Sequence, residues 1–528
     1  MKNRNSHKTF FGKPLTLGDI AFVLSVLYLA ATRFVLLSKV PGIYPDEANF
    51  LEFSHNILRH RFEWGLFTHT FLPRLPLPLI LSGIAETVLG PSIVAIRSVT
   101  AIAGIAAAVL VFLVSKKGDR RSMGAWVAML FMISHPFVLF YNRWGFTYNL
   151  LPVFSMVTLF YCLVPDSSPW QLHRTIAISL LVALAMLTEP ISIALFFSGL
   201  VAVFFRDRRR VFLYSAISFG PLIAYLGYLW LVLGETFSSD LQAILKERLA
   251  APVQIHGVAL GAFVVGLWQS QGWSLCLGFF GLPFLPGRLR RYCIFQFLAW
   301  TTVIMLHASN DYTLIVRESI VLFPLSALGW GALVDRIGRR LYGAIRRDAE
   351  ILIAIIRFGR SRTVALVAVS LLAGVGGYWL LILPIRAILA PESAANPLTM
   401  ISVEDVDALS AATTFLEKNT GPKDLVLGDH LPRLLRCTRA SIMQMAVVEG
   451  AEGNPFFPLD EFRNRRISNA RFTDTKFAVL TPYNYRIETS FPGVSSLIEQ
   501  IRKWPRVFVQ GDIAIYANPA LQPSADMQ

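Results

Sequence analysis

Two adjacent carboxylates, Asp46 and Glu47, follow the first long apolar run in the segment Tyr-Pro-Asp-Glu-Ala. A charged side chain costs about 2.5–3.5 kcal/mol at the centre of a bilayer, so the pair must face water or a polar cleft. We expect Asp46 to serve there as a general base, and Glu47 to orient an acceptor or bind a cation. The alternative is a hydrated turn in which Pro45 starts a helix with acids in its first turn.

Four arginines are candidates for binding a phosphate near this pair, because a guanidinium donates two parallel hydrogen bonds to such a group. They are Arg74, Arg97, Arg143 and Arg317. Arg97 lies near a helix start, where the helix dipole opposes a cation, so it needs an anionic partner: a protein carboxylate or a ligand phosphate. For Arg143, flanked by aromatic residues, the alternative is anchoring at the membrane interface.

Four other polar residues are candidates for an acceptor contact or an accessory role: Glu189, Tyr148, His307 and Glu318. Glu189 precedes Pro190 and could equally cap a turn or pair with an arginine. The histidines have no metal-binding spacing, while Asp46 and Glu47 permit a divalent cation without requiring one. The sequence contains no phosphate-binding loop, serine-hydrolase elbow or HExxH helix, which argues against nucleotide and serine-hydrolase chemistry.

The composition indicates a polytopic membrane protein, with 54% hydrophobic and 16% charged residues and a mean hydropathy of +0.53. Apolar runs of spanning length, together with a stretch at 174–205 that Thr188-Glu189-Pro190 divides in two, predict about eleven transmembrane helices. The runs lie near 18–38, 92–115, 122–141, 146–164, 211–233, 272–287, 292–308, 317–334 and 363–384.

The net charge of +15 lies in short basic clusters between the apolar runs. This is the positive-inside pattern of membrane proteins, so we expect no nucleic-acid partner. With the N-terminus inside, every cluster is cytoplasmic only if the proline-rich stretch 72–90 does not cross the membrane, but re-enters or lies at the interface. Under this topology nine polar residues fall on the outer side, where they would surround an externally open cavity: Asp46, Glu47, Arg97, Arg143, Glu189, His307, Asp311, Arg317 and Glu318.

We therefore predict a transmembrane catalytic domain over residues 1–384, with a first external loop at 39–91. Residues 385–528 are predicted to form a small extracytoplasmic α/β domain, with a disordered tail from about 520. Its expected elements are a helix near 404–418 and strands at Asp424–Leu427, Phe477–Leu480 and Ile513–Tyr516.

These features resemble the membrane glycosyltransferases of the GT-C fold, in the branch of the protein O-mannosyltransferases, the lipid A aminoarabinose transferase and the rhizobial lipopolysaccharide galacturonosyltransferases. The resemblance rests on Tyr-Pro-Asp-Glu-Ala at 44–48, Arg97-Ser98, Tyr141-Asn142-Arg143 with Tyr148, and Arg317 with Pro324. It implies that Asp46 is the catalytic base. It also implies a donor sugar linked through phosphate to a polyprenyl lipid, and an acceptor outside the cytoplasm.

The sequence departs from the family pattern at several positions. Glu189 stands where the family often carries lysine, and Tyr148 or Asn149 replaces a second carboxylate. Pro73-Arg74-Leu75-Pro76 is a loose counterpart of a Glu-Lys-Pro-Pro motif. We therefore do not expect aminoarabinose transfer itself, and the absence of a Trp-Trp-Asp motif argues against an oligosaccharyltransferase.

The prediction is inverting sugar transfer from a polyprenyl-phosphate donor to a lipid, polysaccharide or protein hydroxyl. Phosphate is a good leaving group, so one base and several cations suffice. We expect a monomer in a bacterial inner membrane, surrounded by membrane lipid, with its active site on the periplasmic side. The alternatives are a transporter or flippase of lipid-linked saccharides, and a non-catalytic assembly protein whose external domain binds a partner.

Overall fold

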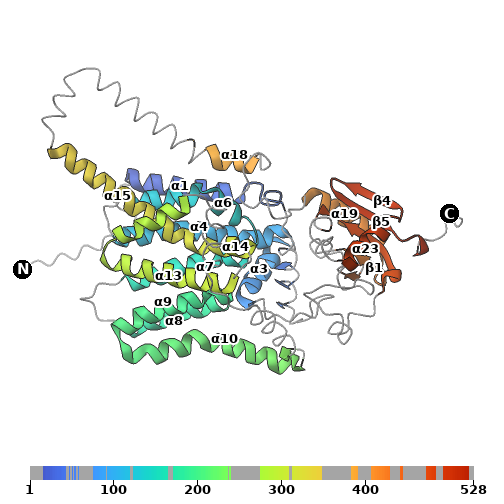
Figure 1. Ribbon diagram of the computed structural model, residues 1–528, viewed down its shortest axis with the longest axis horizontal. Coiled ribbons are helices and arrows are strands. Elements are labelled where there is room, and N and C mark those ends of the chain that lie inside the picture. Colours follow the sequence, from blue (N-terminus) through green and yellow to red (C-terminus); the bar gives the residue numbers. More distant parts are fainter. Residues whose placement is uncertain are drawn as a thin grey trace, which may run out of the picture.

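A bundle of apolar helices forms most of the protein, and a small domain with a β-sheet lies at one end of it (Figure 1). The computed structural model describes residues 16–42, 47, 50–51, 53–54, 57–58, 75–90, 92–118, 123–163, 171–235, 237–238, 274–308, 312–347, 378, 382–389, 406–428, 441–443, 471–482, 484 and 492–521.

Within this described part, four helical stretches are long and apolar enough to cross a membrane: Leu17–Phe34, Ile93–Lys117, Arg208–Leu233 and Ile315–Arg340. They comprise all or most of α1 (Leu17–Phe34), α4 (Ile93–Gly118), α10 (Val211–Leu233) and α15 (Phe323–Arg347). By composition and length the chain is an integral membrane protein.

Several of the other predicted spans are shorter or broken helices: α5 (Gly124–Ser134), α6 (Pro136–Tyr141), α7 (Leu151–Cys162), α8 (Leu172–Met186) and α9 (Ile193–Arg206). A further helix, α13 (Gly287–Ala308), has 22 residues, with Arg288, Arg290 and Arg291 near its start. The predicted count of about eleven is therefore only partly matched, and most of the predicted span 363–384 lies outside the described residues.

Prolines account for two of the breaks, since proline lacks the N–H that continues a helix. Pro136 separates α5 from α6. Pro190 opens a short 3-10 turn between α8 and α9, so Thr188-Glu189-Pro190 divides the stretch 174–205 as predicted. Both breaks release backbone carbonyls and place polar side chains inside the bundle.

The connection between α1 and α4 starts and ends at the same end of the bundle. Arg97, in the second turn of α4, donates hydrogen bonds to the carbonyls of Leu37 and Pro41, which follow α1. Between them, α3 (Pro76–Leu89) has 14 residues and so measures about 21 Å, less than a hydrocarbon core of about 30 Å. The N–H of Leu77 donates to the carbonyl of Leu187, after α8. The chain therefore makes no net crossing between α1 and α4.

Basic residues gather at the opposite end of the bundle, where α4, α9 and α15 end and α13 begins. They are Lys116, Lys117, Arg206, Arg208, Arg209, Arg210, Arg288, Arg290, Arg291, Arg336, Arg339 and Arg340. The sheet domain lies at the other end, beside α3 (Figure 1). The two ends of the bundle therefore differ strongly in charge.

The sheet domain has five described strands in the order β2-β1-β3-β5-β4. They are β1 (Leu425–Leu427), β2 (Ser441–Met443), β3 (Thr475–Leu480), β4 (Arg506–Gln510) and β5 (Ile513–Ala517). β1 pairs in parallel with β2 and β3, whereas β5 runs antiparallel to β3 and β4. The helices are α19 (Val406–Asn419) and α23 (Pro492–Ile501). The predicted helix and strands correspond to α19, β1, β3 and β5, while β2, β4 and α23 were not predicted.

The sheet domain packs against the bundle through the start of α4. Ile93 belongs to the same hydrophobic cluster as Ala408 and Leu409 of α19 and the core of the sheet. An ion pair of 2.8 Å joins Lys39, after α1, to Asp407. The domain is therefore held to the end of the bundle that carries the α1–α4 connection.

Candidate functional site

Glu47 and Arg97 form a buried ion pair that joins the first loop to α4. Arg97 Nε lies 2.9 Å from Glu47 Oε1, and Nη2 lies 2.7 Å from Oε2, with neither side chain exposed. This geometry is the bidentate fork of a strong charge-assisted pair. The carboxylate thus supplies the anionic partner that Arg97 needs near the start of a helix.

The remaining donors of Arg97 bind the backbone of the first loop. They contact the carbonyl oxygens of Leu37, Pro41 and Gly42 at 3.0, 2.8 and 3.0 Å. A guanidinium has five N–H groups, and all five are engaged here. Arg97 is therefore paired with a protein carboxylate, which is one of the two anionic partners that the sequence analysis left open.

Glu47 also reaches the segment that follows α6. Its Oε1 accepts a hydrogen bond of 2.7 Å from the backbone N–H of Gly145. A side chain at position 145 would meet Ile96 and approach Glu47, so glycine is required for this close contact. One buried carboxylate thus connects the first loop, α4 and the 142–149 segment, a positioning role that differs from the predicted acceptor or cation contact.

Arg143 holds the chain after α1 in place. Its Nε, Nη1 and Nη2 donate to the carbonyls of Val40, Thr32 and Val35 at 2.9, 2.7 and 2.7 Å, and its side chain is buried. Next to it, Trp144 Nε1 donates to the Gly42 carbonyl at 2.9 Å. Arg143 is therefore neither an exposed interfacial anchor nor open to solvent, and it stabilises the path of the first loop.

Arg33, in the last turn of α1, is a third buried arginine that sequence reasoning missed. It donates to the carbonyls of Met132 and Ile133 at 2.9 and 3.1 Å. Pro136 has no N–H for the Met132 carbonyl, so the proline break creates the acceptor that Arg33 uses. An arginine inside an apolar run was the available signal, because such a charge requires polar partners.

Two amide side chains shape the 142–149 segment. Asn149 Nδ2 donates to the Tyr141 carbonyl at 2.8 Å, and Asn142 Nδ2 donates to Asn149 Oδ1 at 3.0 Å. Tyr148, between Gly145 and Asn149 in the chain, is only half-buried and packs against the hydrophobic core. The segment is therefore rigid where it contacts Glu47, and Tyr148 is its more accessible residue.

Glu189 is linked to the same segment. It is buried, and its Oε1 accepts a hydrogen bond from the hydroxyl of Thr147. A small pocket lies beside it, between α3, α4 and the 145–150 segment; its lining residues are Phe50, Pro78, Leu79, Ser82, Val99, Thr100, Gly145, Thr147 and Leu150. Thr147 therefore contacts Glu189, in the turn after α8, and also lines the pocket that Phe50 of the first loop borders.

The late helices bring three further candidate residues to this region. The Arg317 guanidinium lies 5.6 Å from the centre of the Phe146 ring, within cation–π range. His307 Nδ1 lies 2.6 Å from Glu318 Oε1, with Glu318 buried and His307 partly exposed. Through Phe146, Arg317 of α14 (Tyr312–Glu318) thus lies beside the segment that Glu47 holds.

Asp46 and Arg74 lie outside the described residues. Among the described ones, no group of three His, Cys, Asp or Glu side chains could hold a metal ion. Of the ten candidate residues, the structure connects Glu47, Arg97 and Arg143 through the first loop. Arg317, Tyr148 and Glu189 contact or belong to the 142–149 segment.

No protein-family model and no curated protein matches this sequence. The structure is similar to ArnT from Cupriavidus metallidurans bound to undecaprenyl phosphate, with 16% identity over 95% of this chain and 98% of ArnT and a TM-score of 0.61. It is also similar to the oligosaccharyltransferase AglB from Archaeoglobus fulgidus in complex with an inhibitory peptide and a dolichol-phosphate, with 12% identity over 96% of this chain and 75% of AglB and a TM-score of 0.50. Both have the GT-C fold, and this chain has that fold.

Proposed function

We propose that the protein transfers a sugar from a polyprenyl-phosphate donor to a hydroxyl of an acceptor outside the cytoplasm. The observation that carries this proposal is the Glu47–Arg97 pair, which holds the Asp46-Glu47 loop at the end of a GT-C bundle opposite the basic clusters. Basic residues favour the cytoplasmic side, so this end faces outward, in keeping with the periplasmic side of a bacterial inner membrane.

Asp46 is the proposed general base. It is bonded to Glu47, and consecutive Cα atoms are about 3.8 Å apart, so the anchoring of Glu47 restricts where Asp46 can lie. Glu47 is paired with Arg97 and accepts from Gly145, which suits it to positioning rather than to proton transfer. In this proposal the two adjacent carboxylates have separate roles, one in the chemistry and one in placing it.

Arg317 and Arg74 are the proposed ligands of the donor phosphate. Arg97 has all its donors engaged, and Arg143 is buried with three of its donors on backbone carbonyls, so both act by holding the first loop. Arg317 is less buried and lies against Phe146, beside the segment that contacts Glu47. Its position suits an anion that arrives from the accessible side.

The reaction is a single displacement with inversion. The acceptor oxygen forms a bond to the anomeric carbon as the bond from that carbon to the phosphate oxygen breaks. The acceptor proton moves to the Asp46 carboxylate, and the electron pair leaves on the polyprenyl phosphate. The guanidinium of Arg317 stabilises the charge on the departing group.

The remaining candidate residues fit the acceptor side. The His307–Glu318 pair lies next to Arg317 in the chain. Tyr148 belongs to the 142–149 segment, and Glu189 contacts that segment through Thr147.

The test is sugar transfer by the purified full-length protein, with a panel of polyprenyl-phosphate sugars as donors. Asp46→Asn should abolish transfer while the unfolding temperature stays unchanged, because an amide cannot take the proton. The matched control is Asp512→Asn, an exposed position in the sheet domain, which should transfer at the native rate. Native-rate transfer by Asp46→Asn would refute the assignment of the base. Translocation of labelled donor across vesicles without any transfer would instead favour a flippase.

A further inference from the structure

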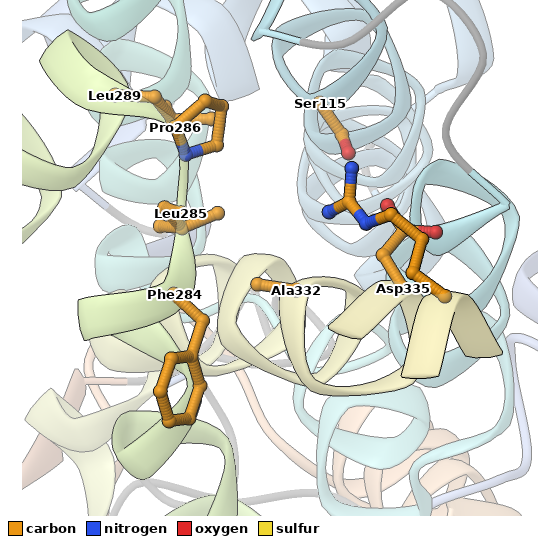
Figure 2. Close-up of a pocket in the computed structure, with 8 residues that line it drawn as sticks. Ser115, Phe284, Leu285, Pro286, Leu289, Ala332 and Asp335 are labelled. Carbon is orange, nitrogen blue, oxygen red and sulfur yellow. The ribbon is translucent and has the colours of Figure 1, made fainter. Parts of the chain in front are cut away.

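A second pocket lies at the basic end of the bundle, far along α4 from the Glu47–Arg97 pair. It is formed where α4 ends, where α13 begins and along α15 (Figure 2). Its lining residues are Ser115, Phe284, Leu285, Pro286, Leu289, Ala332, Asp335 and Arg339, around a space of about 130 Å³. None of these residues belongs to the proposed active site.

The walls of this pocket have two chemical characters. Figure 2 shows an apolar wall on one side of the pocket, formed by Phe284, Leu285, Pro286 and Leu289. Ser115 and Asp335 lie across the gap from this wall. Arg339 completes the polar side. An opening with an apolar side and a side that offers a guanidinium and a hydroxyl suits a ligand that has both an anionic group and a hydrocarbon part.

The single acid of the pocket has a structural task. Asp335 Oδ1 accepts a hydrogen bond of 2.8 Å from the N–H of Gly124, the first residue of α5, and so caps that helix. A second guanidinium lies close to the pocket, since Arg336 is 4.3 Å from the centre of the Phe284 ring. Lys116 and Lys117, which follow Ser115 in the chain, lie over the Phe112 and Phe160 rings instead.

We infer that this pocket binds the phosphate headgroup of an anionic phospholipid from the cytoplasmic leaflet. The basic end of a bundle faces the cytoplasm, and basic pockets between transmembrane helices on that side recognise anionic lipid headgroups. Arg339 and Ser115 bind the phosphate, and the acyl chains pass over Phe284, which is 37% exposed. The site is independent of the proposed transfer reaction and lies at the other end of the bundle.

The experiment uses the full-length protein in neutral detergent and titrates phosphatidylglycerol, phosphatidylcholine and inorganic phosphate separately. Bound lipid is counted by native mass spectrometry, and the unfolding temperature is measured at each step. Phosphatidylglycerol should bind with one preferred site and raise the unfolding temperature, whereas the other two should not. An equal rise with inorganic phosphate would overturn the assignment to a lipid.

The matched variants are Arg339→Gln and Arg340→Gln, neighbours on α15 of which only the first lines the pocket. Each basic residue near a lipid surface contributes about 1 kcal/mol, so Arg339→Gln should weaken phosphatidylglycerol binding about fivefold. Arg340→Gln should bind as the native protein does. Equal losses in both variants would mean a general basic surface and would overturn the proposal.

A third variant tests the cavity itself without altering charge. Ala332→Leu places a larger side chain in the pocket, where Ala332 is 8% exposed, and should also reduce phosphatidylglycerol binding. Its unfolding temperature without lipid shows whether the bundle is intact. Native binding by Ala332→Leu would overturn the proposal even if Arg339→Gln failed to fold.

Discussion

At the scale of single residues, three buried arginines hold together the end of the bundle opposite the basic clusters: Arg33, Arg97 and Arg143. Each binds backbone carbonyls that a helix end or loop has left without an N–H partner. Only Arg97 has a carboxylate among its partners in the described part of the chain, namely Glu47. Arg97 and Arg143, two of the four arginines that are candidate phosphate ligands in the sequence, thus hold the chain that leads from α1 into the first loop.

The buried Glu47–Arg97 pair should contribute strongly to the stability of the protein. Removing one partner of a buried ion pair costs about 3–5 kcal/mol, because the other charge stays buried without compensation. Glu47→Gln should therefore lower the unfolding free energy of the purified protein by about that amount. It should also reduce transfer, because the first loop loses its link to Arg97 and Gly145.

The control for this prediction is Asp407→Asn, which breaks the exposed pair with Lys39, whose side chains are 56% and 63% exposed. An exposed pair contributes about 0–1 kcal/mol, so this variant should stay close to the native stability. Similar losses in the two variants, read from chemical unfolding in detergent, would show that Glu47 is not the anchor.

At the scale of elements, close packing of helices depends on glycines at particular contacts. Gly124 of α5 and Gly331 of α15 face each other, and a Cβ added to either one would collide with the backbone of the other. Small residues permit such close approach between membrane helices. The same contact places Asp335 where it caps α5.

Gly331→Ala should therefore destabilise the protein, because two backbones must separate to admit the methyl group. Overpacking of this kind costs about 1–3 kcal/mol, measured as a lower unfolding free energy. Gly227→Ala in α10 is the matched control, since nothing lies within 4 Å of its added Cβ. It should be neutral or about 0.5–1 kcal/mol stabilising, and a loss equal to that of Gly331→Ala would contradict the packing argument.

At the scale of the whole molecule, the sheet domain packs against the start of α4. Ile93 at the start of α4 lies in the cluster formed by α19 and the sheet, only four residues before Arg97. The same short stretch of α4 therefore contacts both the sheet domain and the first loop. Movement of the domain would be transmitted to the loop that carries the proposed base.

Ile93→Glu should loosen this docking, because a carboxylate buried among Ala408 and Leu409 has no compensating partner. We expect hydrogen exchange in α19 to become about tenfold faster or more, which corresponds to about 1.4 kcal/mol. Lys39→Ala, which removes the exposed ion pair with Asp407, should leave exchange in α19 nearly unchanged. Unchanged exchange in Ile93→Glu would show that the domain is held elsewhere.

Local sequence patterns determined much of the architecture of this protein. Apolar length, basic clusters and a proline beside Glu189 were enough to predict a membrane bundle with polar residues at one end. Alternating short apolar runs were enough to predict α19, β1, β3 and β5. The strand β4 was missed because most of its residues are exposed and its sequence lacks the buried pattern of β5.

Only the tertiary structure decided what each charged side chain contacts. The sequence shows that Arg97 needs an anion, but whether that anion is Glu47 or a phosphate depends on how residues 50 positions apart meet. Likewise, Arg33 finds its carbonyls because Pro136 ends α5 beside it. Hydrogen bonds are short and directional, so the role of a buried charge follows from three-dimensional proximity that composition and spacing do not contain.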